Sequence, residues 1–303
     1  MIIHNKFVLF LKCIPGISDS AIRKLINLNM LNDINFDSQQ SLLTWLNSNQ
    51  VIMSKKFDPS VLTLDDIMKA KMKRELIETN LEKISAKYIT YFDVNYPNSL
   101  KKIKDYPIIL FYKGDISLLN SKKLCTIIGT RNPSQETIIF GEAITKRMVE
   151  KNYVIISGLA LGCDTIAHRT CLKFNGKTIS ILATGIDKVY PKENTKLVND
   201  IILNKGLVMT EQLIGFSGAT YSFANRDRLQ AALSDITIAL ETGIDGGTMH
   251  AAKSSTSKYN KKLITIDPKV LPRGNTSGNI ELYEKYKAIY IKSIEDLNEK
   301  IIF

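Results

Sequence analysis

The sequence has no apolar run near the ~18 residues that a membrane-spanning helix requires. Its first residues also lack the basic start, long apolar stretch and small-residue cleavage site of a secretory signal peptide. These two absences predict a cytoplasmic protein that does not cross a membrane.

Potential metal ligands are few, with four cysteines and three histidines in 303 residues. No two cysteines form a Cys-x-x-Cys pair, and Cys125 lies inside an apolar run, so we expect reduced, buried thiols. Asp164 and His168 lie four residues apart on one predicted helix face, which invites a zinc interpretation. Because no paired metal-ligand motif accompanies them, we expect a hydrogen-bonded structural histidine and no metal site.

Recognised nucleotide and catalytic motifs are also missing. No glycine-rich turn ends in the Gly-Lys-Ser/Thr of a P-loop, and Gly158 and Gly162 do not complete a Gly-x-Gly-x-x-Gly pattern. Asp187 and Glu211 are possible acids, but no nucleophile accompanies them, and we interpret them as loop anchors. The sequence therefore predicts a protein that is not an enzyme and has no cofactor.

Acidic residues are outnumbered: 41 Lys and Arg face 30 Asp and Glu, for a formal charge of +11. Such an excess favours polyanionic partners such as nucleic acid. On composition alone, solvated surface lysines explain the charge equally well. The length is that of a chain with two domains.

The pattern of predicted elements changes along the chain. Residues 1–82 predict a small all-helical domain, and 293–303 a short C-terminal helix or tail without a winged helix. Between them, 83–292 alternates strands and helices, which predicts a doubly wound, mostly parallel, extended Rossmann-like α/β sheet. The expected strands cover 88–92, 106–115, 124–128, 153–157, 178–183, 207–210, 236–240 and 263–266. The expected helices cover 135–151, 163–174, 194–203, 226–233 and 248–257.

The helical start contains an Ile-Pro-Gly-Ile turn around Pro15 and Gly16, after which Ser18 or Asp19 can cap a helix. Such a turn resembles the hairpin of helix-hairpin-helix and SAM-like modules, whose turn amides can hold a DNA phosphate. The alternative is plain punctuation between two helices. Further helices are expected around 39–49 and 64–87.

Three glycine-bearing turns follow predicted strands: Gly129-Thr130-Arg131, the turn that begins at Ser157-Gly158, and Gly185-Ile186-Asp187, which leads to Lys192. Backbone amides and the helix dipole at such turns suit a phosphate. Because parallel strands end at one edge of the sheet, the turns are expected to line one anion-binding crevice. Arg131 would add a permanent positive charge there.

The order of these motifs resembles the DNA-processing protein A family (DprA/Smf) over about two thirds of the chain. The resemblance implies binding of single-stranded DNA without sequence preference, delivery of the strand to the RecA recombinase during natural transformation, and a homodimer. The motifs that carry it are Tyr96-Pro97, Tyr106-Pro107 with Gly114-Asp115, Ile128 to Arg131, Ile156 to Ala160 with Gly162, Asp164 and His168, Gly185-Ile186-Asp187 with Tyr190-Pro191-Lys192, Thr210-Glu211, Phe223 to Arg228, Gly246-Gly247-Thr248, and 274–279.

The resemblance also implies which residues bind the nucleic acid. Asp227 replaces the asparagine between the family's two arginines, and Gln230 stands where an aliphatic residue is usual. The acid would weaken DNA binding or pair internally with an arginine. Aromatic rings can stack on bases or belong to the core, and the candidates are Tyr190, Tyr221 and Phe223. The implied nucleic-acid-binding residues are Gly129, Thr130, Arg131, Ser157, Gly158, Lys192, Arg226 and Arg228.

Two alternatives use the same crevice. Gly246-Gly247-Thr248 resembles the glycine turn of the lysine-decarboxylase-like (LOG) nucleotide phosphoribohydrolases, which would make the protein a nucleotide-binding or nucleotide-hydrolysing enzyme. The glutamate expected soon afterwards is absent from 249–257. A nucleotide-sensing module of phage defence is the other alternative.

Overall fold

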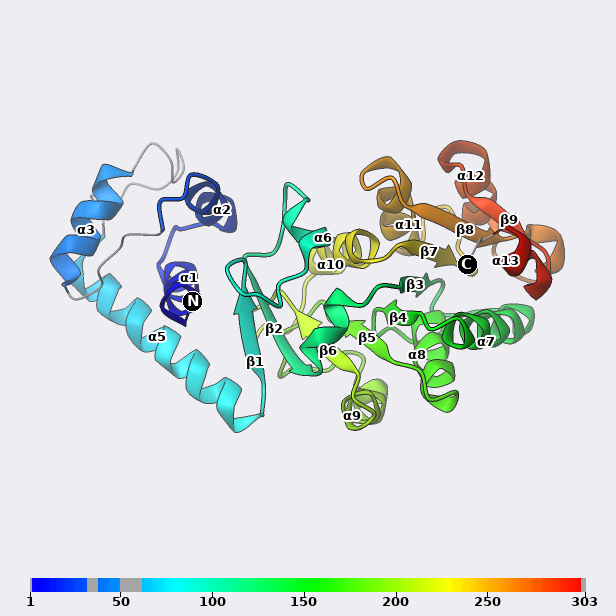
Figure 1. Cartoon of the computed structure of the whole chain (residues 1–303), viewed down its shortest axis with the longest axis horizontal. Helices are drawn as coiled ribbons and strands as arrows, with labels where there is room; N and C mark the ends of the chain where they lie inside the picture. Colours follow the sequence, from blue (N-terminus) through cyan, green and yellow to red (C-terminus); the bar gives the residue numbers. More distant parts are fainter. Residues whose placement is uncertain (1, 32–37, 50–61, 301–303) are drawn as a thin grey trace. The chain divides into compact units, whose positions relative to one another are not determined.

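The computed structural model describes residues 2–31, 38–49 and 62–300 (Figure 1). Residues 32–37 and 50–61 of the predicted helical domain, and 301–303 of the predicted tail, lie outside the described residues. The chain divides into two compact units, Met1–Tyr96 with Lys104–Leu110, and Pro97–Ile103 with Phe111–Phe303. No helix among the described residues is both long and apolar enough to span a membrane.

The first unit is mainly helical. Of the two caps that the sequence allowed, Ser18 is the one that caps the second helix, by accepting a hydrogen bond from the Ala21 amide at 3.2 Å. Thr63 and Asp66 form a reciprocal capping box that fixes the start of the last helix. The elements are α1 (Ile2–Cys13), α2 (Asp19–Asn27), α3 (Gln39–Ser48), α5 (Leu64–Lys83) and β1 (Lys87–Thr90).

A nine-stranded sheet has the order β1-β2-β6-β5-β4-β3-β7-β8-β9. β2 pairs with β6 antiparallel. All neighbouring strands further along this order, from β6 and β5 to β8 and β9, are parallel. The strands of the second unit's sheet are β2 (Ile109–Gly114, which begins in the first unit), β3 (Leu124–Ile128), β4 (Val154–Ser157), β5 (Thr178–Ile181), β6 (Leu207–Thr210), β7 (Ile236–Ala239), β8 (Lys262–Ile266) and β9 (Ile289–Ile291).

Helices cover both faces of this sheet (Figure 1). On one face, α7 and α8 bury a core around Ile127, Ile144 and Cys171. On the other, α11 and α12 bury a second core around Met249 and Leu282. The helices are α6 (Asn98–Lys101), α7 (Gln135–Glu150), α8 (Cys163–Lys173), α9 (Thr195–Leu203), α10 (Thr220–Leu233), α11 (Thr248–Ser257), α12 (Ser277–Tyr286) and α13 (Ile294–Lys300), with short 3-10 turns η2 (Ile116–Asn120), η3 (Lys192–Asn194) and η4 (Pro268–Val270).

The predicted fold class, a doubly wound and mostly parallel α/β sheet with a helical N-terminal region, is confirmed. α10 begins at Thr220, six residues earlier than predicted, because the Ser222 hydroxyl accepts from the Ala219 amide and starts the helix within a polar segment. α12 and β9 were not predicted. β9 has only three residues, too few for an alternating pattern to be visible.

Candidate nucleic-acid interface

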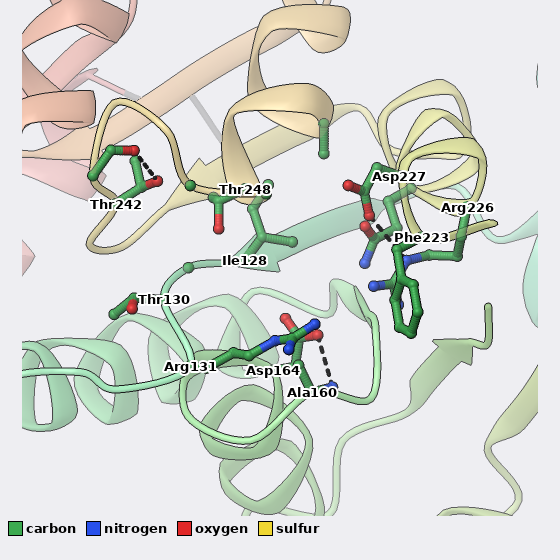
Figure 2. A pocket seen from close by; sticks show the side chains of 16 residues that line it. Ile128, Thr130, Arg131, Ala160, Asp164, Phe223, Arg226, Asp227, Thr242 and Thr248 are labelled. Atoms are coloured by element: carbon green, nitrogen blue, oxygen red, sulfur yellow. Dashed lines mark hydrogen bonds and ion pairs between the residues drawn. The ribbon is translucent and has the colours of Figure 1, made fainter. Parts of the chain in front are cut away.

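The site lies where the order of the parallel strands reverses. β3 is hydrogen-bonded to β4 on one side and to β7 on the other, although β7 enters the sheet much later in the chain. The loops that leave two such strands diverge and open a crevice at their carboxyl ends. This crevice contains a cavity of about 310 Å³. Its lining comes from the turn after β3, the turn after β4 with the start of α8, the loop after β7, and helices α10 and α11 (Figure 2).

The turn after β3 is held by its backbone. The Thr130 amide donates to the Glu241 carbonyl at 2.8 Å, and the Cys163 amide donates to the Thr130 carbonyl at 3.1 Å. These bonds leave the Arg131 side chain exposed at the edge of the cavity. Its guanidinium carbon lies 5.8 Å from the centroid of the Phe223 ring. The turn is therefore a fixed base that carries a solvent-accessible cation.

Gly162 brings the second turn against the first. It has a left-handed φ of 75°, and a Cβ built there would lie 2.4 Å from the Arg131 carbonyl oxygen. An L side chain is strained at that φ and has no room at that contact. Glycine at this position therefore lets α8 start in close contact with the Arg131 backbone carbonyl.

Ser157 ends β4 and is fully buried. Its hydroxyl lies 2.6 Å from the Ile127 carbonyl oxygen and 3.0 Å from Asp164 Oδ1, between which it shares its proton. Asp164 Oδ2 accepts from the Ala160 amide at 3.1 Å. The Ser157 side chain thus shapes the second turn from inside and has no surface for a ligand.

Gly158 allows close contact with α10, because a Cβ there would come within 2.0 Å of Arg226 Nη1. Its carbonyl oxygen accepts a 2.7 Å hydrogen bond from His168 Nε2, while Nδ1 lies 2.7 Å from the Thr178 hydroxyl. Burial lowers the pKa of His168. A neutral imidazole with both nitrogens engaged is a structural residue, as the sequence predicted.

The third turn brings Lys192 to the surface at the start of η3. The turn is joined to the second by Asn194, whose amide donates to the Leu159 carbonyl and the Thr165 hydroxyl, both at 2.9 Å. Tyr190 is half exposed, and its ring centroid lies 5.9 Å from that of Phe223. Lys192 itself does not line the 310 Å³ cavity.

α10 adds a buried ion pair to the cavity wall. Arg226 donates through Nη1 to the Ile181 carbonyl at 2.7 Å and through Nε to Asp227 Oδ1 at 3.0 Å. With its side-chain amide oriented to satisfy both partners, Gln230 donates to the same Oδ1 at 3.2 Å and accepts from the Gly158 amide. Burial raises the pKa of Asp227 to about 6, against the opposing effect of Arg226. The sequence anticipated such an internal pairing.

Arg228, one helical step further, is held elsewhere. It makes a two-point ion pair with Glu211, at 2.7 Å from Nη1 to Oε1 and 2.6 Å from Nη2 to Oε2. Both side chains are 12% exposed. Among the implied site residues the cavity therefore unites Gly129, Thr130, Arg131 and Arg226, whereas Ser157, Gly158, Lys192 and Arg228 lie outside its lining.

Glu241 is a site residue that the sequence reasoning missed. It directly follows the β7 apolar run and is 3% exposed. Oε2 accepts from the Ser134 amide, the Ser134 hydroxyl and the Thr137 hydroxyl, at 3.0, 2.9 and 2.6 Å. Oε1 accepts from the Asn275 amide at 2.9 Å. An acid directly after the mostly apolar run 236–240 was the available signal. No group of three or more metal-ligating side chains occurs among the residues that the structure covers.

Comparison of the sequence with known proteins points to one family. The sequence profile of the DNA recombination-mediator protein A family matches residues 87–302. The DNA processing protein DprA of Bacillus subtilis is 29% identical over 274 residues, which cover 87% of this chain and 91% of that protein. DprA of Streptococcus pneumoniae is 35% identical over 177 residues, 58% and 62% of the two chains. Protein Smf of Synechocystis is 30% identical over 195 residues, and the match spans 48% of its length.

Two solved structures share the fold. DprA from Streptococcus pneumoniae superposes with a TM-score of 0.78 at 24% identity, over 99% of this chain and 98% of that one. DNA processing protein A from Helicobacter pylori, described for its single-stranded DNA binding mode, superposes with a TM-score of 0.63 at 30% identity, over 71% and 96%. The family is described as a DNA recombination mediator, which agrees with the prediction of a non-enzymatic protein. The chain belongs to the DNA recombination-mediator protein A (DprA/Smf) family.

Proposed function

We propose that this protein binds single-stranded DNA without sequence preference through the crevice at the carboxyl ends of β3, β4 and β7. The observation that carries the proposal is Arg131, an exposed guanidinium on a rigid turn. It forms no ion pair with any residue in 2–31, 38–49 or 62–300. An unpaired cation held over a crevice is available to a phosphate at little cost in side-chain ordering.

The eight implied binding residues then take two roles. Arg131 and Lys192 are exposed and contact phosphates directly, while the Gly129 and Thr130 backbone lets the strand approach closely. The other four act through position: Arg226 and Arg228 are already paired with carboxylates, and Ser157 and Gly158 shape the second turn. Phe223, which lies between Arg131 and Tyr190, offers a ring on which a base can stack.

The wider role is proposed from family membership. The strand would be delivered to a RecA-type recombinase in the cytoplasm during DNA uptake, by a homodimer. Edge strand β9, with Ile280 and Tyr283 exposed beside it on α12, offers an apolar surface for a second copy. We also propose 1–82 as a SAM-like module, 83–292 as the DNA-binding domain and 293–303 as a short terminal element.

The direct test is a titration of labelled oligo(dT) against wild type, Arg131→Ala and Lys192→Ala over a series of salt concentrations. Each lost phosphate contact should reduce the slope of log affinity against log salt by roughly 0.7. Matched controls are Arg169→Ala and Lys196→Ala, which remove exposed cations from α8 and α9 outside the cavity lining. The controls should bind as wild type does.

The proposal is wrong if correctly folded Arg131→Ala and Lys192→Ala have the same affinity and the same salt slope as wild type. The crevice would then not contact the DNA. Tight binding of a mononucleotide, or release of a free base from one, would favour the nucleotide sensor or the nucleotide hydrolase instead. Delivery to the recombinase has its own readout: the lag before a RecA filament forms on DNA should shorten only with variants that bind DNA.

A further inference from the structure

The cavity beneath Arg131 has its own chemistry. Its volume of about 310 Å³ is at the lower end of the range for small-molecule sites, about 300–1,000 Å³. The charged residues of its lining are Arg131, Arg226, Asp164 and Asp227, whose formal charges cancel. A phosphate, which carries negative charge, gains little by entering a site with no net charge. The interior therefore suits an uncharged polar group, while phosphates stay at the rim with Arg131.

One carboxylate oxygen in the lining of this cavity accepts no hydrogen bond from the described residues. Both oxygens of Asp164 already accept hydrogen bonds, from Ser157 and from the Ala160 amide. Asp227 Oδ1 is occupied by Arg226 and by Gln230. Asp227 Oδ2, however, has no hydrogen-bond donor among the described residues. Figure 2 shows the Asp227 carboxylate extending from α10 into the space that faces α11.

A flat apolar surface lies on the same face of that helix. Phe223 precedes Asp227 by four residues, which places the two side chains one above the other on α10. Both line the 310 Å³ cavity and the open groove next to it. A ring stacked on Phe223 would thus present its edge toward the free oxygen of Asp227. A nucleobase is a planar uncharged ring with polar groups on its edge.

We propose that Asp227 makes this site selective for a base that carries an exocyclic amino group. A carboxylate oxygen opposite the C4 substituent accepts from the N4 amine of cytosine but meets the O4 oxygen of uracil or thymine as one acceptor against another. The inference rests on the proposed function, since the base arrives as part of a bound strand. It adds a preference for base type to contacts that are otherwise made through phosphates.

The test compares oligo(dC) with oligo(dU) of about 20 nucleotides, long enough to fill the site. The two bases differ in the amino or oxo group at C4 and the matching protonation of N3. Wild type should bind oligo(dC) about fivefold more tightly or better. Asp227→Asn should bind oligo(dC) and oligo(dU) with equal affinity, because the asparagine amide can turn either its oxygen to the cytosine amine or its NH2 group to the uracil oxygen. Asp245→Asn, which removes an exposed carboxylate outside the cavity lining, should keep the wild-type ratio.

The outcomes separate the inference from the proposed function. If wild type binds both oligonucleotides tightly at low salt with equal affinity, base selection by Asp227 is wrong and strand binding stands. If it binds neither, the proposed function fails. If the preference persists in folded Asp227→Asn, another group selects the base. The comparison of the two oligonucleotides on wild type holds even if the variant does not fold.

Discussion

Arg228 and Glu211 are joined by two hydrogen bonds, of 2.7 and 2.6 Å, that tie α10 to the residue after β6. Two parallel bonds between guanidinium and carboxylate are the strongest common form of this interaction. With each side chain 12% exposed, solvent screens the pair only weakly. The pair therefore fixes the position of α10, which carries Phe223, Arg226 and Asp227.

Glu211→Gln should lower the free energy of unfolding by about 2–3 kcal/mol, because it removes the carboxylate from a mostly buried guanidinium. Chemical denaturation measures the change. The matched control is Glu150→Gln, whose partner Arg147 belongs to a pair 28% and 43% exposed. That variant should change the free energy of unfolding by no more than about 0.5 kcal/mol. Equal effects of the two substitutions would show that the Arg228 pair contributes no more than a surface pair.

Gly158→Ala should lower both stability and DNA affinity. The added methyl group would lie 2.0 Å from Arg226 Nη1 and 2.4 Å from Asp164 Oδ2, so the buried ion pair must shift. Overpacking of this kind costs about 1–3 kcal/mol in the free energy of unfolding. Gly247→Ala is the control, because a Cβ there meets nothing within 4 Å and its φ of −55° is open to alanine. Its stability should change by less than about 1 kcal/mol. A Gly158→Ala protein as stable as Gly247→Ala would contradict the close contact.

The overall fold was predictable because its strands and helices follow from the local pattern of apolar and polar residues. Each central strand is short, buried and rich in Ile, Val or Leu, and β6 and α11 have the bounds that the sequence predicted. The site was harder. The sequence located Arg131, but exposure and pairing are tertiary properties. Arg131 and Arg228 therefore looked alike, although Arg131 is exposed and Arg228 is held by Glu211. The hydrogen bonds that Glu241 accepts from Ser134 and Thr137 join residues more than 100 positions apart, which no local sequence pattern reveals.

Asp227 should make stability depend on pH. It binds its proton at about pH 6 in the folded protein and at about 3.8 in the unfolded chain. Between these values the folded state binds more protons, so its stability falls as pH rises through this window. Once it is fully ionised, well above pH 6, the buried carboxylate costs about 3 kcal/mol. This contribution disappears below about pH 4.

The measurement is the free energy of unfolding of wild type and Asp227→Asn at pH 4 and pH 8. The stability of the variant relative to wild type should be higher at pH 8 than at pH 4 by about 2–3 kcal/mol. The lowered pKa of His168 acts with the opposite sign, since it favours the folded state as pH rises, but it is present in both proteins and cancels. A pH-independent difference would mean that Asp227 is not perturbed.

Glu241→Gln should loosen the Arg131 turn. The glutamate accepts four hydrogen bonds, and its amide replacement would direct an NH2 group at some of the same donors. We expect a loss of about 2–4 kcal/mol in the free energy of unfolding. Because the Glu241 carbonyl also receives the Thr130 amide, affinity for oligo(dT) should fall with it, and amide exchange at Thr130 should become faster.

Glu142→Gln provides the comparison, as it removes an exposed carboxylate from α7, the helix whose N-cap, Ser134, donates to the Glu241 carboxylate. That substitution makes the local charge more positive without touching the turn, so DNA affinity should stay the same or rise slightly. A fall in affinity for Glu241→Gln against this background cannot come from charge, because both variants lose one negative charge. It would come from the position of Arg131. Unchanged affinity in Glu241→Gln would instead show that the turn keeps its shape without the carboxylate.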